Sequence, residues 1–227
     1  MLALLLLLQA GSPEIIVTGQ KLVEEQAKCV HGDCTPLRDA QATIALAEQR
    51  FRDGDYLKAK YLLAAAIRRN KDKGSEAPRP VAAIYEAMAT VALHEGDQNA
   101  YRRAVAGQVK TLRDNLPADD VAVLAASTAL GDMWIKLGNY RQAAATYRGI
   151  EDQALAQGRA HPAIMAGMKR AWLAAAQGER REAARMLDEL EQRPIAQQPG
   201  YRTALRVLRL RLAARDGDDA AITRLAE

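Results

Sequence analysis

A glycine followed by a polar residue recurs along this chain at a nearly constant interval, and this repeat restricts the fold more than any other feature. The intervals are 42, 42, 40 and 39 residues, and the glycines are Gly54, Gly96, Gly138, Gly178 and Gly217. A fixed period of this size is typical of stacked supersecondary units, each of which buries its apolar face against its neighbours. The sequence therefore predicts a repeat protein.

Each unit has the signals of a helical hairpin. An apolar-periodic stretch of helical length precedes each glycine, which can take the left-handed conformation that ends a helix. The next residue is Asp or Asn in four of the five units and can cap a second helix. The first helix opens at Thr35 and Pro36, an N-cap and a first-turn proline. We therefore expect an all-α fold of about five antiparallel hairpins over residues 36–227.

Other small and helix-breaking residues fit the same units. Five positions after the glycine, three units have a small residue that would let two helices approach closely: Ala59, Ala143 and Ala183. The later prolines fall between the units, where they would start or break helices: Pro78, Pro80, Pro117, Pro162, Pro194 and Pro199. The chain is rich in Ala, Leu, Arg, Glu and Gln and has one Phe, which favours closely packed helices.

The third unit resembles the tetratricopeptide repeat (TPR) at nearly every signature position: Leu130, Gly131, Trp134, Gly138, Tyr140, Ala143 and Tyr147. The first and fourth units are similar to it at fewer positions, and the second and fifth least. The period exceeds the usual 34 residues of the family and is similar to its 42-residue variants. The resemblance implies a right-handed α-solenoid that binds another protein and carries no catalytic centre.

The resemblance also implies that the first helix of each hairpin lines a concave groove. One row across the units is then Glu48, Thr90, Asp132, Trp172 and Arg211, and the row one turn later is Arg52, His94, Lys136, Ala176 and Arg215. Our candidate partner groove comprises Glu48, Arg52, Asp132, Lys136, Trp172, Arg211 and Arg215. Trp172 either anchors the partner or packs against the next hairpin. The Lys, Asn and Arg set with which the family clamps a peptide carboxylate is not matched, so such a ligand is not supported.

Positive charge gathers near the C-terminus, where the spacing places Arg202, Arg206 and Arg209 on one helix face, close to Arg211 and Arg215. This face is either a patch for phosphate or an acidic partner, or a solvated outer surface. The net charge is only +4, and no aromatic platform accompanies the arginines. A nucleic-acid partner is therefore not expected.

The N-terminus predicts export. Residues 1–8 are continuously apolar, which is too short for the roughly 20 residues of a membrane span but suits the core of a signal peptide. We expect residues 1–10 to be this signal peptide, cleaved near Ala10. No Lys or Arg precedes the run, so either the true start lies upstream or the signal is atypical. The alternative is a buried strand or helix end.

Cys29 and Cys34 form the second indication of export. Four residues separate them, and Gly32 would let this loop turn tightly. In an oxidising compartment such a pair is most simply a disulfide within an N-terminal segment of residues 11–35. The alternatives are a zinc site with His31, a redox pair with unusual spacing, or two unrelated thiols. The expected location is the periplasm.

The stretch from Glu14 to Gln20 is β-branched and resembles a segment near the mature N-terminus of alphaproteobacterial receptors that depend on TonB. Together with the cysteine loop and long repeats, it resembles periplasmic proteins with a TonB-like domain after such repeats. This resemblance implies part of an envelope transport complex. No β-rich C-terminal segment is present, which argues against transducing activity in this chain. The divergent fifth unit ends at Glu227 without a polar capping helix, so the chain is either complete or a truncated part of a longer protein.

Catalytic patterns are largely absent. The three histidines lie far apart, and there is no phosphate loop, Gly-x-Ser-x-Gly or His-Glu-x-x-His sequence. We expect a non-catalytic envelope scaffold without cofactor or metal. The first alternative is the repeat portion of a TonB-linked component. The second is an accessory domain of an envelope enzyme, which would need a pocket with paired carboxylates of raised pKa.

Overall fold

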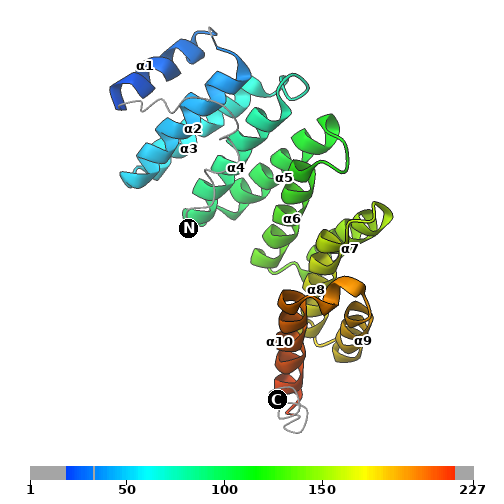
Figure 1. The fold of residues 1–227 in the computed structure, drawn as a ribbon. Helices are drawn as coiled ribbons and strands as arrows, with labels where there is room; N and C mark the ends of the chain where they lie inside the picture. The colour runs from blue at the N-terminus through cyan, green and yellow to red at the C-terminus, as the bar shows by residue number, and fades with distance from the viewer. Residues whose placement is uncertain (1–18, 33, 218–227) are drawn as a thin grey trace.

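The computed structural model describes residues 19–32 and 34–217, and within these ranges the regular structure is entirely helical. Successive helices pack as antiparallel pairs along the chain (Figure 1). The helices are α1 (Gly19–Val30), α2 (Pro36–Arg52), α3 (Tyr56–Asn70), α4 (Pro78–His94), α5 (Gln98–Asn115), α6 (Val121–Lys136), α7 (Tyr140–Ala156), α8 (Ala160–Ala176), α9 (Arg180–Glu191) and α10 (Pro199–Asp216), with a 3₁₀ turn η1 (Pro194–Gln197) before the last. The predicted all-α solenoid of hairpins is confirmed.

The repeat glycines act as predicted. Each lies directly after the first helix of its unit and has a φ between 67° and 83°, in the left-handed region that favours glycine. Asp55, Asp97 and Asn139 follow the first three glycines, and each side chain accepts a hydrogen bond from the backbone N–H three residues later. These contacts satisfy N–H groups that the helix itself leaves unpaired. The local sequence thus sets both ends of the turn in the first three units, whereas Glu179 of the fourth unit makes no side-chain cap.

Four complete hairpins lie within the described residues: α2/α3, α4/α5, α6/α7 and α8/α9. Helix α10 is the first helix of the fifth unit and ends at Gly217. The expected partner helix of α10 falls on residues 218–227, outside the described ranges, as does the predicted signal peptide. In the part of the chain that the structure describes, no helix has the length and apolar character needed to cross a bilayer.

The predicted disulfide between Cys29 and Cys34 is formed. It joins the last turn of α1 to the start of α2, and Gly32 between them has a φ of 95°. Helix α1, which our sequence analysis did not predict, packs against α2 at the N-terminal end of the stack (Figure 1).

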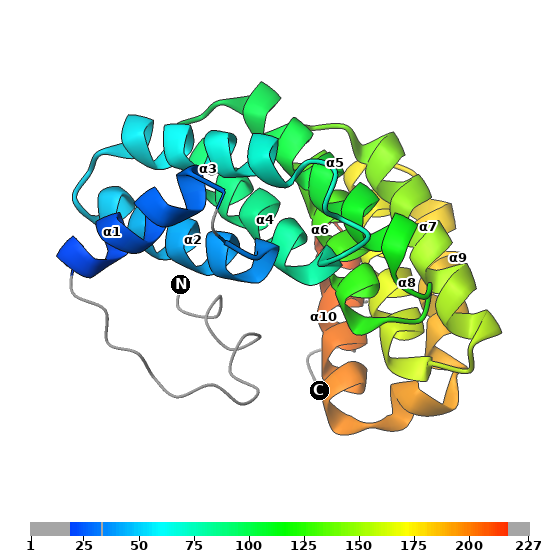
Figure 2. The same ribbon diagram turned by 90° about the horizontal axis from the view of Figure 1, so that it is seen from above.

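The stack is curved, and its two rows of helices lie on opposite sides. Seen from above (Figure 2), the first helices of the units, α2, α4, α6, α8 and α10, follow the inner side of an arc. The second helices, α3, α5, α7 and α9, follow the outer side. Side chains that project from several first helices therefore converge on the inner surface.

Close packing within the third unit fixes a polar side chain at that inner surface. A Cβ atom at Gly131 of α6 would lie 2.7 Å from the ring of Tyr147 on α7, so only glycine leaves room for this ring. The Tyr147 ring is 2% exposed, and its hydroxyl donates a hydrogen bond to Asp132 at 2.7 Å. The carboxylate of Asp132 is thereby held at a set position on α6.

A buried carboxylate joins the third unit to the fourth. Glu151 on α7 is 3% exposed and forms ion pairs with Arg170 on α8 and with Arg193, which lies between α9 and η1. One carboxylate therefore connects α7, α8 and the turn after α9.

A second buried carboxylate joins the two helices of the first unit. Asp39 on α2 is 4% exposed, and it accepts hydrogen bonds from Arg69 at 2.6 Å and Asn70 at 2.6 Å, both on α3. Arg69 donates a second bond through Nε at 3.1 Å, and the Thr43 hydroxyl donates a further one, also at 3.1 Å. These donors replace the water that Asp39 loses on burial.

Candidate functional site

A cavity of about 560 Å³ opens on the inner side of the arc, between the first helices of the third, fourth and fifth units. We call it the α6/α8/α10 groove. Its lining comprises Asp132, Ile135 and Lys136 from α6, Met165, Met168, Lys169 and Trp172 from α8, and Ala204, Val207, Leu208 and Arg211 from α10. The structure thus brings together four of the predicted groove residues: Asp132, Lys136, Trp172 and Arg211.

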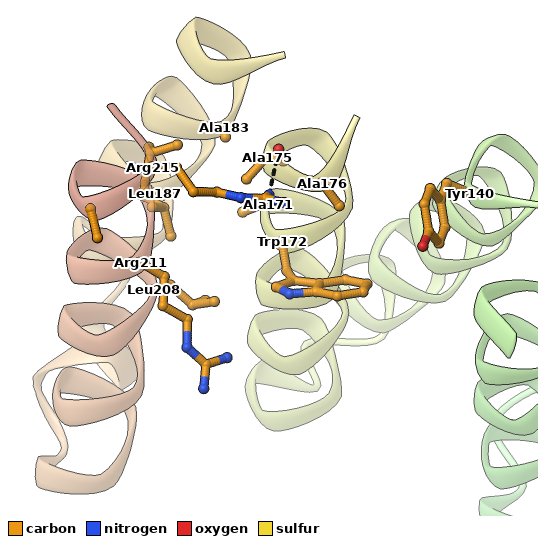
Figure 3. A pocket seen from close by; sticks show the side chains of 12 residues that line it. Tyr140, Ala171, Trp172, Ala175, Ala176, Ala183, Leu187, Leu208, Arg211 and Arg215 are labelled. Atoms are coloured by element: carbon orange, nitrogen blue, oxygen red, sulfur yellow. Dashed lines mark hydrogen bonds between the residues drawn. The ribbon is translucent and has the colours of Figure 1, made fainter. Parts of the chain in front are cut away.

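A second cavity of about 390 Å³ continues the groove between the C-terminal ends of α8 and α10 (Figure 3). The two cavities share Trp172, Leu208 and Arg211. Arg215, another predicted groove residue, reaches from α10 to α8 and donates a hydrogen bond to the carbonyl oxygen of Ala175 at 2.9 Å, drawn dashed in Figure 3. This bond connects the two helices at that end of the cavity.

The lining follows from helical spacing. Met165, Met168, Lys169 and Trp172 stand at positions i, i+3, i+4 and i+7 of α8, which share one face of a helix. The lining residues of α10 have the same spacing and lie 39 positions further along the chain. The sequence predicted the row of Trp172 and the row after it but not the lining residues that precede Trp172. Apolar residues four and seven positions before Trp172 and before Arg211 were the available signal.

The floor of the groove is apolar and open to solvent. Met165 is 43% exposed and Val207 is 40% exposed, although both are large apolar side chains. Trp172 is half-buried, and its ring meets the ring of Tyr140 edge to face at a centroid distance of 6.3 Å. An exposed apolar patch bordered by charged residues is typical of an interaction site.

The charged rim of the groove is predominantly positive. The one carboxylate, Asp132, is already occupied by the Tyr147 hydroxyl and by the Lys169 ammonium at 2.9 Å. Burial raises the pKa of Tyr147 well above its usual range, and the neighbouring Asp132 raises it further, so this hydroxyl stays protonated. Lys136 lies over the Tyr101 ring, 5.7 Å from its centroid. Among the described residues, Arg211 has neither a hydrogen bond nor an ion pair.

The two remaining predicted residues, Glu48 and Arg52, line neither part of the groove. Both lie on α2, at the other end of the stack (Figure 2). Burial raises the pKa of Glu48, and the positive charge of Arg52 opposes that shift. Beyond Arg52 in the predicted row, the His94 ring packs against Phe51 and Tyr56, with centroid distances of 4.9 and 4.6 Å. The rings of Phe51, Tyr56 and His94 therefore pack together at this end of the predicted row.

The arginines predicted to share a face of the C-terminal helix do so. Arg202, Arg206 and Arg209 line a third cavity of about 480 Å³ beside α9 and η1. Arg209 is paired with Glu191 and Asp188 of α9. Part of the positive charge on this face is therefore neutralised within the protein.

Carboxylates are sparse in the three cavities described above. The groove and its continuation contain one, Asp132, and the third cavity also contains one, Glu191. In residues 19–32 and 34–217, no cluster of three or more potential metal-ligating side chains is found.

Comparison with known proteins identifies the fold. No family model matches the sequence, and no curated protein matches it. Among solved structures, BtubC (BKLC) from P. vanneervenii is 16% identical with a TM-score of 0.65, over 91% of this chain and 85% of that chain. TPR-like repeats of a candidate kinesin light chain from Podospora anserina are 15% identical with a TM-score of 0.60, over 76% and 83%. PilW, a type IV pilus biogenesis factor, is 15% identical with a TM-score of 0.52, over 82% and 74%. The chain therefore has a TPR-type helical repeat fold.

Proposed function

We propose that this protein is a non-catalytic scaffold that binds another protein in the α6/α8/α10 groove. The observation that carries the proposal is the solvent-exposed apolar floor, which spans the first helices of three successive units and has a charged rim. Protein interfaces commonly have an apolar centre surrounded by polar groups, and Trp and Arg contribute strongly to their affinity. Trp172 and Arg211 have these roles in the proposal.

The contacts around Trp172 suit it to anchor a partner. Its ring is placed against Tyr140, and Arg215 holds α10 to α8 beside it. The methionines on the floor are flexible and polarisable, so they can adjust to the shape of an incoming side chain. Binding therefore depends on burial of apolar surface around a positioned aromatic ring.

Photo-crosslinking from the groove tests this proposal. A photoreactive amino acid at Val207 is expected to capture one discrete partner in the cells that naturally express the protein. The matched control position is Leu57, which is 75% exposed and belongs to α3, a helix on the outer side of the arc. Equal capture of the same partner from Leu57 would contradict the proposal.

With the captured partner purified, Trp172→Ala is expected to raise its Kd by about 30-fold, because a central Trp is commonly worth at least about 2 kcal/mol. Val207→Asp places a charge on the exposed floor without disturbing the core and is expected to weaken binding as well. Thermal unfolding of both variants shows whether they are folded. Unchanged affinity in two folded variants would refute the groove as the binding site.

We further propose that the scaffold works in the bacterial periplasm. The supporting features are the Cys29–Cys34 disulfide, since disulfides persist in oxidising compartments, and the apolar run at residues 1–8. The likeness to a type IV pilus biogenesis factor agrees with an envelope location. We expect the intact mass of the natively expressed protein to correspond to a chain that has lost the residues up to about Ala10. We also expect both cysteine thiols to be alkylated only after reduction. A full-length mass with both thiols directly alkylated would refute export.

An envelope transport complex containing TonB is the more specific alternative. It rests on the resemblance of residues 14–20 and on the long repeats. A β-rich sequence downstream of Glu227 in the gene would support this alternative, and a stop codon there would remove it.

A further inference from the structure

We propose that the occupant of the α6/α8/α10 groove is an amphipathic helix of the partner protein, with an apolar stripe flanked by Asp and Glu. This inference rests on the proposed function and specifies the chemistry of the partner. Three properties of the groove carry it: the hydrogen-bonding groups in the lining, the shape of the floor and the charge of the rim.

The lining has donors for the carbonyl groups of an extended peptide but almost no acceptors for its N–H groups. Its polar side chains are one carboxylate, three cations and the Trp172 indole, with no Asn, Gln, Ser or Thr. Lys, Arg and the indole only donate hydrogen bonds, and the single carboxylate, Asp132, already accepts from Tyr147 and Lys169 through one of its two oxygens. Most N–H groups of a strand that faced the lining would therefore lose water without gaining an acceptor, which is costly. A helix pairs its own backbone groups internally and avoids this cost.

The floor suits one face of such a helix. Apolar side chains from α8 and α10, among them Met165, Met168, Val207 and Leu208, form the two sides of a trough around Trp172. A volume of about 560 Å³ accepts a few apolar side chains but not a whole helix, whose diameter is about 10–12 Å. A partner helix would therefore insert the side chains at its positions i, i+3, i+4 and i+7.

The rim selects acidic flanks beside that stripe. Lys136, Lys169 and Arg211 surround the floor, and the single opposing charge, Asp132, is paired with Lys169. The net positive rim would attract Asp and Glu on a partner and repel Lys and Arg. Arg211, which makes no ion pair with any described residue, is the side chain best placed to bind a carboxylate of the partner.

Three synthetic peptides of about 18 residues, ~27 Å long as helices, test the inference by fluorescence anisotropy with the full chain. The first has Leu at i, i+3, i+4 and i+7 and Glu on both flanks. The second replaces Glu with Lys, and the third keeps Glu but has two prolines within the stripe, which prevent a helix. We expect the first to bind at least about 10-fold more tightly than the others at low salt.

Reversal of one charge on the rim distinguishes a loss of peptide recognition from a loss of folding. Arg211→Glu is expected to raise the Kd of the Glu peptide by about 5–10-fold and to lower the Kd of the Lys peptide. A variant with an unfolded groove would bind both peptides more weakly. The matched control is Arg202→Glu, on the same helix but outside the groove. It is expected to change the Kd of either peptide by less than about twofold.

Each other result overturns the inference in a different way. Equal binding of the proline peptide refutes a helical occupant, and equal or tighter binding of the Lys peptide refutes acidic flanks. The inference is also refuted if none of the three peptides binds. It is refuted as well if the protein forms concentration-dependent dimers that Val207→Asp prevents, because the occupant of the groove is then a second copy of this chain. The proposed function fails separately, when no partner crosslinks from Val207.

Discussion

Glu151→Ala is expected to lower the free energy of unfolding by about 3–5 kcal/mol, because it leaves two largely buried arginines without their counter-charge. Glu151 is 3% exposed and pairs with Arg170 and Arg193. The Nη1 atom of Arg193 is already buried without a hydrogen-bond partner, so loss of the carboxylate would leave this guanidinium still less satisfied. Urea denaturation followed by circular dichroism measures the change.

The control for this variant is Glu189→Ala on α9. Glu189 also pairs with an arginine, Arg185, but both side chains are more than half exposed. Exposed pairs contribute about 0–1 kcal/mol, so this variant should stay within about 0.5 kcal/mol of the wild type. Similar losses for both variants would show that Glu151 is not a buried connection between the third and fourth units.

Asp39→Ala is the second change with a large expected effect, a loss of about 3 kcal/mol or more. The substitution removes the acceptor for Arg69 and for Asn70, whose side chain is fully buried. A buried amide donor and a largely buried guanidinium would both lose their partner on α2, and the first hairpin would loosen. Thermal unfolding and hydrogen exchange of α2 and α3 measure this loss.

The same carboxylate makes stability depend on pH. Burial alone would raise the pKa of Asp39, but the hydrogen bonds from Arg69, Asn70 and Thr43 and the charge of Arg69 lower it below its usual value of 3.8. Its stabilisation is therefore complete above the unfolded-state pKa and is lost as the pH falls through the folded-state pKa. The stability gap between the wild type and Asp39→Asn should narrow below about pH 4. A gap that is constant from pH 7 to pH 2.5 would contradict this assignment.

The sequence was sufficient to predict the hairpins, because their ends depend on local chemistry. A glycine at positive φ and an Asp or Asn cap act within a few residues, as at Gly138 and Asn139. Helix α1 was missed because it lacks the glycine-and-cap signature of the later units. In the structure, packing on α2 and the disulfide at Cys29 hold it.

The groove could be predicted only in part. Repeat positions identified Asp132 and Trp172, since the first helices of all units present equivalent faces. Which pair of neighbouring helices leaves an open trough depends on how the whole stack curves, and a single unit does not encode this. For that reason the predicted row included Glu48 of α2, which lies outside the groove. The ion pairs of Glu151 span 19 and 42 residues and could not be chosen from many other pairings in the sequence.

The placement of the two buried carboxylates has a consequence for how such a chain evolves. Asp39 holds together the first hairpin, while Glu151 connects α7, α8 and the turn after α9, next to the groove. In stacked repeats each unit contacts mainly its immediate neighbours. Mutations in the first hairpin can therefore accumulate without displacing Trp172. We expect substitutions on the surface of the first hairpin that keep Asp39 and its donors to leave the geometry of the groove unchanged.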